Sequence, residues 1–183
     1  MKILAVVGSL RAASFCRKLA QAAADASPEG VDVTLTDGRD LPHYDQDLDG
    51  DEKPAPVQAM VDAVNAADAL LFVTPEYNYG IPGQLKNWID WASRPAFNSP
   101  LKGKPALVMS ASLAPAGGAR AHMHLTQVLG GTLTPCYLAP SFVVPAVHTQ
   151  FDEDGALADE VTKGRLDKTL AAFVGWAREQ SST

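Results

Sequence analysis

The sequence predicts an α/β protein built on a doubly wound, five-stranded parallel sheet with helices on both faces. Short apolar runs alternate with amphipathic stretches in the order βαβαβαβαβα, which is the pattern of strands joined by crossover helices. The runs 3–7 and 69–73 are continuously apolar, as expected of strands buried on both faces. With 183 residues, 46% of them hydrophobic, the chain is expected to form one domain over residues 1–183.

The first half of the chain supplies three strands and two helices. The first apolar run leads into a helix over 14–26, for which Ser14 or a neighbour can serve as the N-cap. Residues 31–36 alternate apolar and polar side chains, which favours an outer strand with one wetter face. A long polar loop follows, and the pattern then predicts a helix over 58–67 before the strand at 69–73.

The second half repeats the alternation twice. A helix over 83–93 has an apolar, tryptophan-containing face, and a short apolar run over 104–110 predicts the fourth strand. The next helix is expected to end near Leu129, where two glycines stop it. A fifth strand is expected within 132–144, interrupted by prolines, and an amphipathic helix over 158–179 closes the chain.

Five parallel strands of this kind fit the flavodoxin-like order 2-1-3-4-5. In such a sheet the strand order reverses between strands one and three, and ligands bind at that point, outside the carboxyl ends of the strands. The loops 8–14 and 74–83 would meet there. They are also the two most unusual loops of the sequence, so the crevice between them is the predicted ligand site.

The loop 8–14 offers groups that suit a terminal phosphate. Ser9, Arg11 and Ser14 come immediately before a helix, whose N-terminus presents unpaired N–H groups and a partial positive charge. The loop contains neither Gly-x-Gly-x-x-Gly nor Gly-Lys-Ser/Thr, which disfavours dinucleotide cradling and P-loop chemistry. The alternative interpretation, with Ser14 only a helix cap and Arg11 only a solvated charge, is equally compatible with this loop by itself.

Two further loops carry candidate ligand contacts. Tyr77 and Tyr79 flank Asn78, and aromatic bodies beside backbone donors suit a planar heterocycle with polar edges. These tyrosines could instead cover an apolar surface or an oligomer contact. The small residues of the loop 110–120 allow a close backbone approach to a ring, and Arg120 is a candidate anion or interface contact.

Composition argues against several other functions. A net charge of −6 gives no basic excess for nucleic acid or an anionic membrane. The two thiols, Cys16 and Cys136, are not expected to form a disulfide, and Cys16 is expected to be a small buried core residue. The chain starts with a strand instead of a signal sequence and lacks an apolar run of membrane-spanning length, so a cytoplasmic enzyme is expected.

No metal site is expected. The acidic loop 45–56 matches the first half of an EF-hand, but Pro56 stands where the bidentate Glu belongs. His122 and His124 lie two residues apart in an expected helix and therefore point to different faces.

Taken together, these motifs resemble the NADPH-dependent FMN reductase family, flavodoxin-like proteins that include quinone, chromate and azo-dye reductases. The resemblance is carried by Gly8-Ser9-Leu10-Arg11 with Ser14, by Thr74-Pro75-Glu76-Tyr77-Asn78, and by Pro82-Gly83-Gln84-Leu85-Lys86-Asn87. It extends to about residue 175. One departure is the loop 110–120, where Ser110 and Ala114 replace glycines and a proline is displaced to position 115.

The resemblance implies an FMN site and a set of residues that form it. The phosphate would bind Ser9, Arg11 and Ser14 with the backbone of Phe15 and Cys16, and the isoalloxazine ring would contact a second set: Pro75, Glu76, Tyr77, Asn78 and Ser112. Homodimers or homotetramers are implied as well, with Glu76, Tyr79 and the helix containing Trp88 near subunit contacts.

The leading hypothesis is therefore an FMN-dependent NAD(P)H oxidoreductase. NADPH or NADH would pass a hydride to flavin N5 and leave, and a quinone-like acceptor would then take its place in a ping-pong scheme. No side chain is assigned a catalytic role. An electron carrier or flavin-delivery module without NAD(P)H turnover is the alternative, and a phospho-ligand binding protein that uses no flavin is a third reading.

Overall fold

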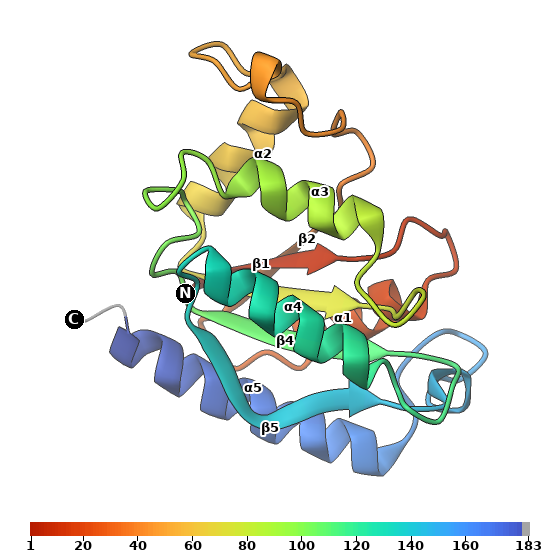
Figure 1. The fold of residues 1–183 in the computed structure, drawn as a ribbon. Helices are drawn as coiled ribbons and strands as arrows, with labels where there is room; N and C mark the ends of the chain where they lie inside the picture. The colour runs from red at the N-terminus through yellow and green to blue at the C-terminus, as the bar shows by residue number, and fades with distance from the viewer. Residues whose placement is uncertain (181–183) are drawn as a thin grey trace.

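A five-stranded parallel sheet forms the middle layer of the protein (Figure 1). In the computed structural model, which describes residues 1–180, the strand order is β2-β1-β3-β4-β5 and every neighbouring pair is parallel. The predicted order 2-1-3-4-5 is thereby confirmed. The strands are β1 (Lys2–Val7), β2 (Asp32–Thr36), β3 (Ala69–Thr74), β4 (Ala106–Ala111) and β5 (Cys136–Val144).

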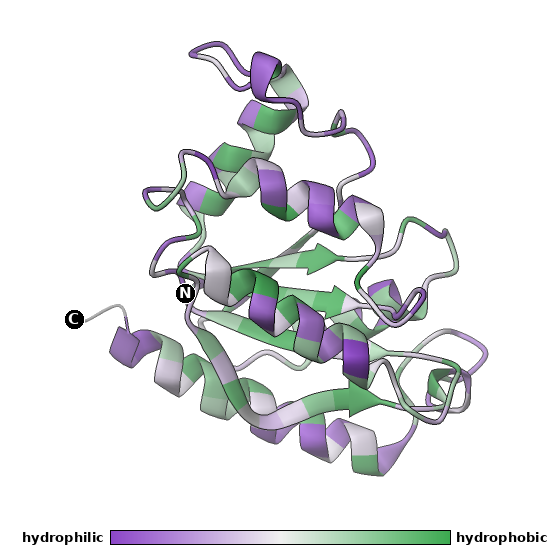
Figure 2. Cartoon of the chain, viewed as in Figure 1, coloured by the Kyte–Doolittle hydropathy of each residue, from purple (hydrophilic) through white to green (hydrophobic). Residues whose placement is uncertain are grey.

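Helices cover both faces of this sheet, and each face has its own apolar core. One core is formed with α1 (Phe15–Asp25) and α5 (Glu160–Gln180), and the other with three helices: α2 (Ala55–Ala66), α3 (Gly83–Ala92) and α4 (Ala119–Gly131). Figure 2 shows the apolar residues gathered on the strands, with hydrophilic residues on the outward turns of the helices. This is the expected arrangement for a doubly wound sheet.

Burial along the strands follows the sequence pattern. All residues of β3 and β4 are buried, whereas β2 alternates between exposed and half-buried residues at the edge of the sheet. The central strands are continuous apolar runs in the sequence because both of their faces pack against helices. Both tryptophans of α3, Trp88 and Trp91, are fully buried and belong to the core.

Two predicted helix boundaries were wrong. The helix expected over 58–67 begins at Ala55, and its first turn contains Pro56. Proline is accepted there because the N–H groups of a first turn make no hydrogen bond within the helix. The helix expected to end at Leu129 continues through both glycines. The left-handed residue that ends the helix is Leu133, with a positive φ of 61°, and not one of the glycines. The N–H groups of Leu133 and Thr134 then bond to the carbonyls of Gly130 and Leu129, which closes the helix in a Schellman motif.

The edge strand β5 departs from regular pairing. Its register with β4 shifts between Leu107 and Met109, which places an irregular segment containing Pro140 on the open edge. Proline and bulges at such an edge discourage pairing with other chains. Two short 3-10 helices, Gln46–Leu48 and Val147–Thr149, complete the described elements. None of the helices in the described chain is long and apolar enough to cross a membrane.

Candidate functional site

A single cavity brings together all but one of the residues that the sequence predicted to bind a ligand. It has a volume of about 270 Å³ and is lined by residues that follow β1, β3 and β4. The predicted residues in its wall are Ser9, Arg11, Ser14, Phe15, Cys16, Pro75, Glu76, Tyr77 and Ser112. Asn78 lies in an adjoining open hollow of about 500 Å³, which shares Glu76 and Ser112 with the cavity.

Polar groups without partners gather at the α1 end of this cavity. Ser14 is the N-cap of α1, and its hydroxyl accepts a hydrogen bond from the Arg17 N–H at 3.3 Å. Ser9 and Ser14 are only 4% and 3% exposed. Within residues 1–180 the Ser9 hydroxyl has no hydrogen-bond partner, so it is available to a ligand at the cavity wall. Together with the first turn of α1 and the exposed Arg11, these groups fit a phosphate.

Cys16 belongs to the same wall but offers no reactive thiolate. Burial raises the pKa of the Cys16 thiol to about 12, and the hydroxyl of Ser14 offsets this only in part. The side chain is 3% exposed and packs in the core, as expected from the sequence. A thiol that stays protonated at neutral pH is a poor nucleophile.

A tight turn after β3 forms the opposite side of the site. Tyr77 and Gly80 exchange two backbone hydrogen bonds of 3.0 Å each. Between them Asn78 and Tyr79 have positive φ values of 51° and 66°, the geometry of a type I′ turn. Among the described residues, neither of these two N–H groups has a partner. The turn therefore presents two free backbone donors and the exposed rings of Tyr77 and Tyr79.

The carboxylate of Glu76 is engaged by α4. It accepts hydrogen bonds from the backbone N–H groups of Arg120 at 3.0 Å and Ala121 at 3.1 Å, and from the Arg120 guanidinium at 3.0 Å. Desolvation raises the pKa of Glu76, but these bonds outweigh it and hold the pKa below its usual value. The Arg120 guanidinium also lies 4.2 Å from the centre of the Tyr79 ring.

This role of Glu76 was not foreseen from the sequence. The N-cap of α4 is Gly118, which has no side chain to accept a hydrogen bond from the first turn. A helix that begins at glycine needs an acceptor from elsewhere, and Glu76 supplies it. A ligand contact from Glu76 would therefore come from its backbone.

The loop after β4 is shaped by two glycines. Gly117 and Gly118 have positive φ values of 60° and 84°. The Ser110 hydroxyl donates to the Gly117 carbonyl at 3.0 Å, and the Ser112 hydroxyl accepts from the Ala114 N–H at 3.2 Å. Ser112 remains at the cavity wall despite the departures from the family pattern in this loop. The apolar wall also includes Val147, a contact that sequence reasoning missed.

The histidines do not form a site. His122 is buried, with Nε2 3.1 Å from the Val108 carbonyl oxygen, and burial lowers its pKa more than this hydrogen bond raises it. His124 instead accepts a hydrogen bond from the Ile81 N–H at 3.4 Å. Over residues 1–180, no group of three or more His, Cys, Asp or Glu side chains could hold a metal ion.

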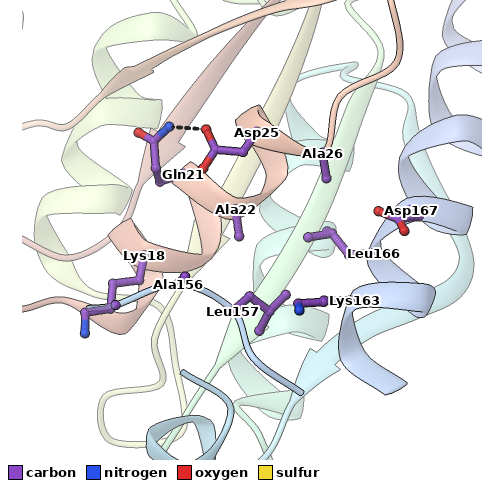
Figure 3. Close-up of a pocket in the computed structure, with 11 residues that line it drawn as sticks. Lys18, Gln21, Ala22, Asp25, Ala26, Ala156, Leu157, Lys163, Leu166 and Asp167 are labelled. Atoms are coloured by element: carbon purple, nitrogen blue, oxygen red, sulfur yellow. Dashed lines mark hydrogen bonds between the residues drawn. The ribbon is translucent and has the colours of Figure 1, made fainter. Parts of the chain in front are cut away.

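A separate cavity of about 310 Å³ lies between α1 and α5 (Figure 3). Its charged lining residues carry both signs, as Lys18 and Lys163 accompany Asp25 and Asp167. Its inner lining includes small apolar side chains such as Ala22. None of the residues predicted to bind a ligand lines it, so it is distinct from the site at the carboxyl ends of the strands.

Comparison with known proteins agrees with this geometry. Residues 1–149 match the model of the family described as NADPH-dependent FMN reductase. An NAD(P)H-dependent FMN reductase of Pseudomonas aeruginosa is 38% identical over 178 residues, covering 97% of this chain and 96% of that protein. A quinone reductase of Escherichia coli is 36% identical, with coverage of 94% and 93%. The solved structure of FerB, a flavoenzyme NAD(P)H:(acceptor) oxidoreductase from Paracoccus denitrificans, superposes with a TM-score of 0.90 at 35% identity and covers 98% of both chains.

Proposed function

Since this chain belongs to the NADPH-dependent FMN reductase family, we propose that it is an FMN-dependent NAD(P)H oxidoreductase that reduces quinones or similar acceptors. One observation supports this most directly. A cavity with unpartnered polar groups at a helix N-terminus adjoins an open hollow beside a tyrosine-bearing turn whose backbone donors are free. A phosphate at one end and a planar ring at the other match these two halves.

The chain's residues would hold FMN in two groups. Ser9, Arg11 and Ser14 would bind the phosphate through hydroxyl and guanidinium hydrogen bonds. The N–H groups of Phe15 and Cys16 would add the positive end of α1. The second group, which would contact the isoalloxazine ring, consists of Pro75, Glu76, Tyr77, Asn78 and Ser112.

When bound, FMN supplies the hydride-transfer chemistry, and the protein orients it. The free N–H groups of Asn78 and Tyr79 are donors for the polar edge of the ring, and their positions are fixed by the paired backbone of the turn. The hollow beside them is open and flanked by the exposed Tyr79 ring, so NAD(P)H and the acceptor would both reach the flavin from this side.

No side chain of the site is required to move a proton. The carboxylate of Glu76 is bound by Arg120, and the thiol of Cys16 stays protonated. A proton needed by the reduced acceptor would come from water, which reaches the site through the open hollow. We further propose that the protein works as a homodimer or homotetramer in the cytoplasm, where its two free thiols are suited to a reducing environment.

The decisive experiment is the visible spectrum of the purified protein followed by steady-state turnover. We expect flavin absorbance bands, release of FMN on heating, and oxidation of NADPH that depends on a simple quinone. A protein that FMN neither colours nor stabilises against heat would overturn the proposal. Flavin binding with almost no quinone-dependent NADPH oxidation would instead identify an electron carrier.

A further inference from the structure

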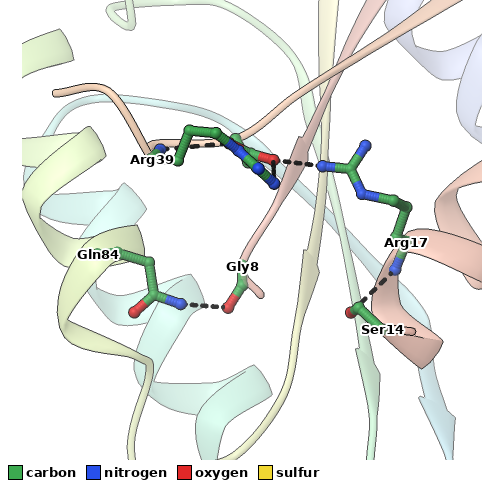
Figure 4. Close-up of polar contacts among 6 residues, drawn as sticks. Gly8, Ser14, Arg17, Arg39 and Gln84 are labelled. Carbon is green, nitrogen blue, oxygen red and sulfur yellow. Dashed lines mark hydrogen bonds and ion pairs between the residues drawn. The ribbon is translucent and has the colours of Figure 1, made fainter. Parts of the chain in front are cut away.

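Gln84, in the first turn of α3, is hydrogen-bonded to the loop that follows β1. Its Nε2 donates to the Gly8 carbonyl at 2.9 Å, across 76 residues of chain (Figure 4). Gly8 in turn donates its N–H to the Val73 carbonyl at 2.8 Å. Both backbone polar groups of Gly8 are therefore engaged, and the peptide that joins it to Ser9 is held in one orientation.

The space around Gly8 is equally restrictive. A Cβ at this position would lie 3.0 Å from Leu85 Cδ2, 3.2 Å from the Val73 carbonyl oxygen and 3.3 Å from Pro75 Cδ. The loop after β1 thus runs directly against the start of α3 and the loop after β3. A Cβ here would require these neighbours to give way by a few tenths of an ångström, so glycine suits this close approach.

The fixed carbonyl determines where the next N–H group points. In a trans peptide, the C=O of one residue and the N–H of the next point in opposite directions. The Gly8 carbonyl points to α3 on one face of the sheet, so the Ser9 N–H points toward the other face, where α1 packs. Figure 4 shows Gln84 and the α1 cap Ser14 on opposite sides of Gly8.

The Ser9 N–H is directed at the ligand site and is free to bind there. Ser9 lines the cavity, whereas Gln84 does not. Within the described chain, its N–H group donates to no other residue. We propose that Gln84 is a positioning residue, which holds the Gly8–Ser9 peptide so that the Ser9 N–H faces the bound phosphate without itself contacting the cofactor.

This inference rests on the proposed function, since it assigns the anion to FMN. It also gives a reason for the glutamine in the Pro82-Gly83-Gln84 segment, which none of the ligand contacts explains. The test compares FMN with riboflavin, because the two ligands share the ring and differ in the phosphate. A loss of general order in the site would weaken both ligands, whereas a misdirected Ser9 N–H weakens FMN alone.

Gln84→Met keeps the length of the side chain and removes the donor. We expect its Kd for FMN, measured by fluorescence titration of the flavin-free full chain, to rise about tenfold, while its Kd for riboflavin stays within about twofold of the unmodified protein. Gln58→Met is the matched control. Gln58 also donates one side-chain hydrogen bond, to Asp62 at 2.8 Å on the exposed face of α2, and its replacement should change neither Kd.

A measurement on the unmodified protein keeps the test decisive if Gln84→Met folds poorly. The amide signal of Ser9 in a nitrogen–proton correlation spectrum should shift on adding FMN and stay nearly unchanged with riboflavin. The role of Gln84 would be overturned if the ratio of the Kd values for FMN and riboflavin were unchanged in Gln84→Met. It would also be overturned if the Ser9 amide signal did not shift on adding FMN. Failure of the unmodified protein to bind FMN at all would overturn the proposed function instead.

Discussion

Glu76 and Arg120 lie 44 residues apart in the chain, and the Glu76 carboxylate accepts a 3.0 Å hydrogen bond from the Arg120 backbone N–H and forms a 3.0 Å ion pair with its guanidinium. The contact connects the loop after β3 to the first turn of α4. The loop after β3 lines the proposed flavin site, so this contact fixes one wall of the site to α4. The Glu76 carboxylate is also the acceptor that the glycine N-cap of α4 lacks.

Removing this carboxylate should lower the stability of the fold. Glu76→Ala is expected to lower the free energy of unfolding by about 1–2 kcal/mol at pH 7, which is the scale of a lost helix cap. Urea denaturation measures this difference. Glu153→Ala is the control, because Glu153 lies in an exposed turn. An equal effect of both substitutions would show that the helix cap contributes nothing.

The same contact should make stability depend on pH. The pKa of Glu76 is below its usual value in the folded protein, so ionisation of this group favours folding. Its contribution is complete above the pKa of an unfolded glutamate, about 4.3, and is lost as the pH falls through the lower pKa of the folded state. The stability difference between the unmodified protein and Glu76→Gln should therefore shrink between about pH 5 and pH 3. A difference that grows on acidification would contradict this.

Arg11 is the one cation predicted to bind the phosphate, and its removal tests that assignment. Arg11→Ala should weaken FMN binding by roughly 1.5–3 kcal/mol, the scale of a charged hydrogen bond. Binding of riboflavin should be nearly unaffected. Arg39→Ala is the matched control, because the guanidinium of Arg39 is exposed but already bound to Asp37 at 3.0 Å. Unchanged FMN affinity in Arg11→Ala would remove this residue from the site.

Asn78 is proposed to act through its backbone, and its conformation offers a test. Its φ of 51° lies in the left-handed region, which glycine and asparagine tolerate and β-branched residues do not. Asn78→Gly should leave FMN affinity almost unchanged, whereas Asn78→Val should lower the free energy of unfolding by about 1–2 kcal/mol and weaken FMN binding. Differential scanning calorimetry and FMN titration measure the two effects. A large loss of FMN affinity in Asn78→Gly would show that the side chain makes the contact.

The strand order and the location of the candidate cavity could be predicted because both depend on local pattern. Continuous apolar runs mark β1 and β3 as central strands, and the loops after them must meet at the reversal of strand order. The hydroxyls of Ser9 and Ser14 were predicted as ligand contacts because their loop lies at that reversal. Their partners, by contrast, depend on residues far away in the sequence.

The contacts that were missed are all of this long-range kind. Nothing near Glu76 indicates that its acceptor role is for α4, and nothing near Gln84 indicates that its partner is Gly8. The prediction of where α4 ends was wrong for a different reason. Two glycines suggested a stop, but the left-handed position that closes the helix is occupied by Leu133, a residue that seldom adopts it.

Both cysteines should be slow to react in the folded protein. Burial raises the pKa of Cys136 to about 11, and the pKa of the more deeply buried Cys16 is higher still. At pH 8 both thiols are almost entirely protonated, so labelling with a disulfide reagent should be far slower than for free cysteine. In urea, where the protein is unfolded, two thiols per chain should react rapidly with the reagent. Rapid labelling of one thiol under native conditions would show a thiolate that this environment does not permit.

Two glycines should respond to alanine in opposite directions. At Gly117 a Cβ would lie 2.6 Å from Val143 Cγ1, 2.8 Å from the Pro145 nitrogen and 2.9 Å from the Val144 carbonyl carbon. The φ there is also positive, at 60°. Because two of these neighbours are backbone atoms that cannot rotate away, Gly117→Ala should lower the free energy of unfolding by about 2 kcal/mol or more.

Gly130 is the matched comparison. It lies in the last turns of α4, and a Cβ there would have no atom within 4 Å. Gly130→Ala should raise the free energy of unfolding by about 0.5–1 kcal/mol, because alanine loses less backbone entropy than glycine on entering a helix. Urea denaturation of both variants gives the two signs in one experiment. Destabilisation by Gly130→Ala would mean that the Schellman closure at Leu133 depends on glycine before it, whereas a neutral Gly117→Ala would mean that the loop after β4 shifts away from β5 at little cost.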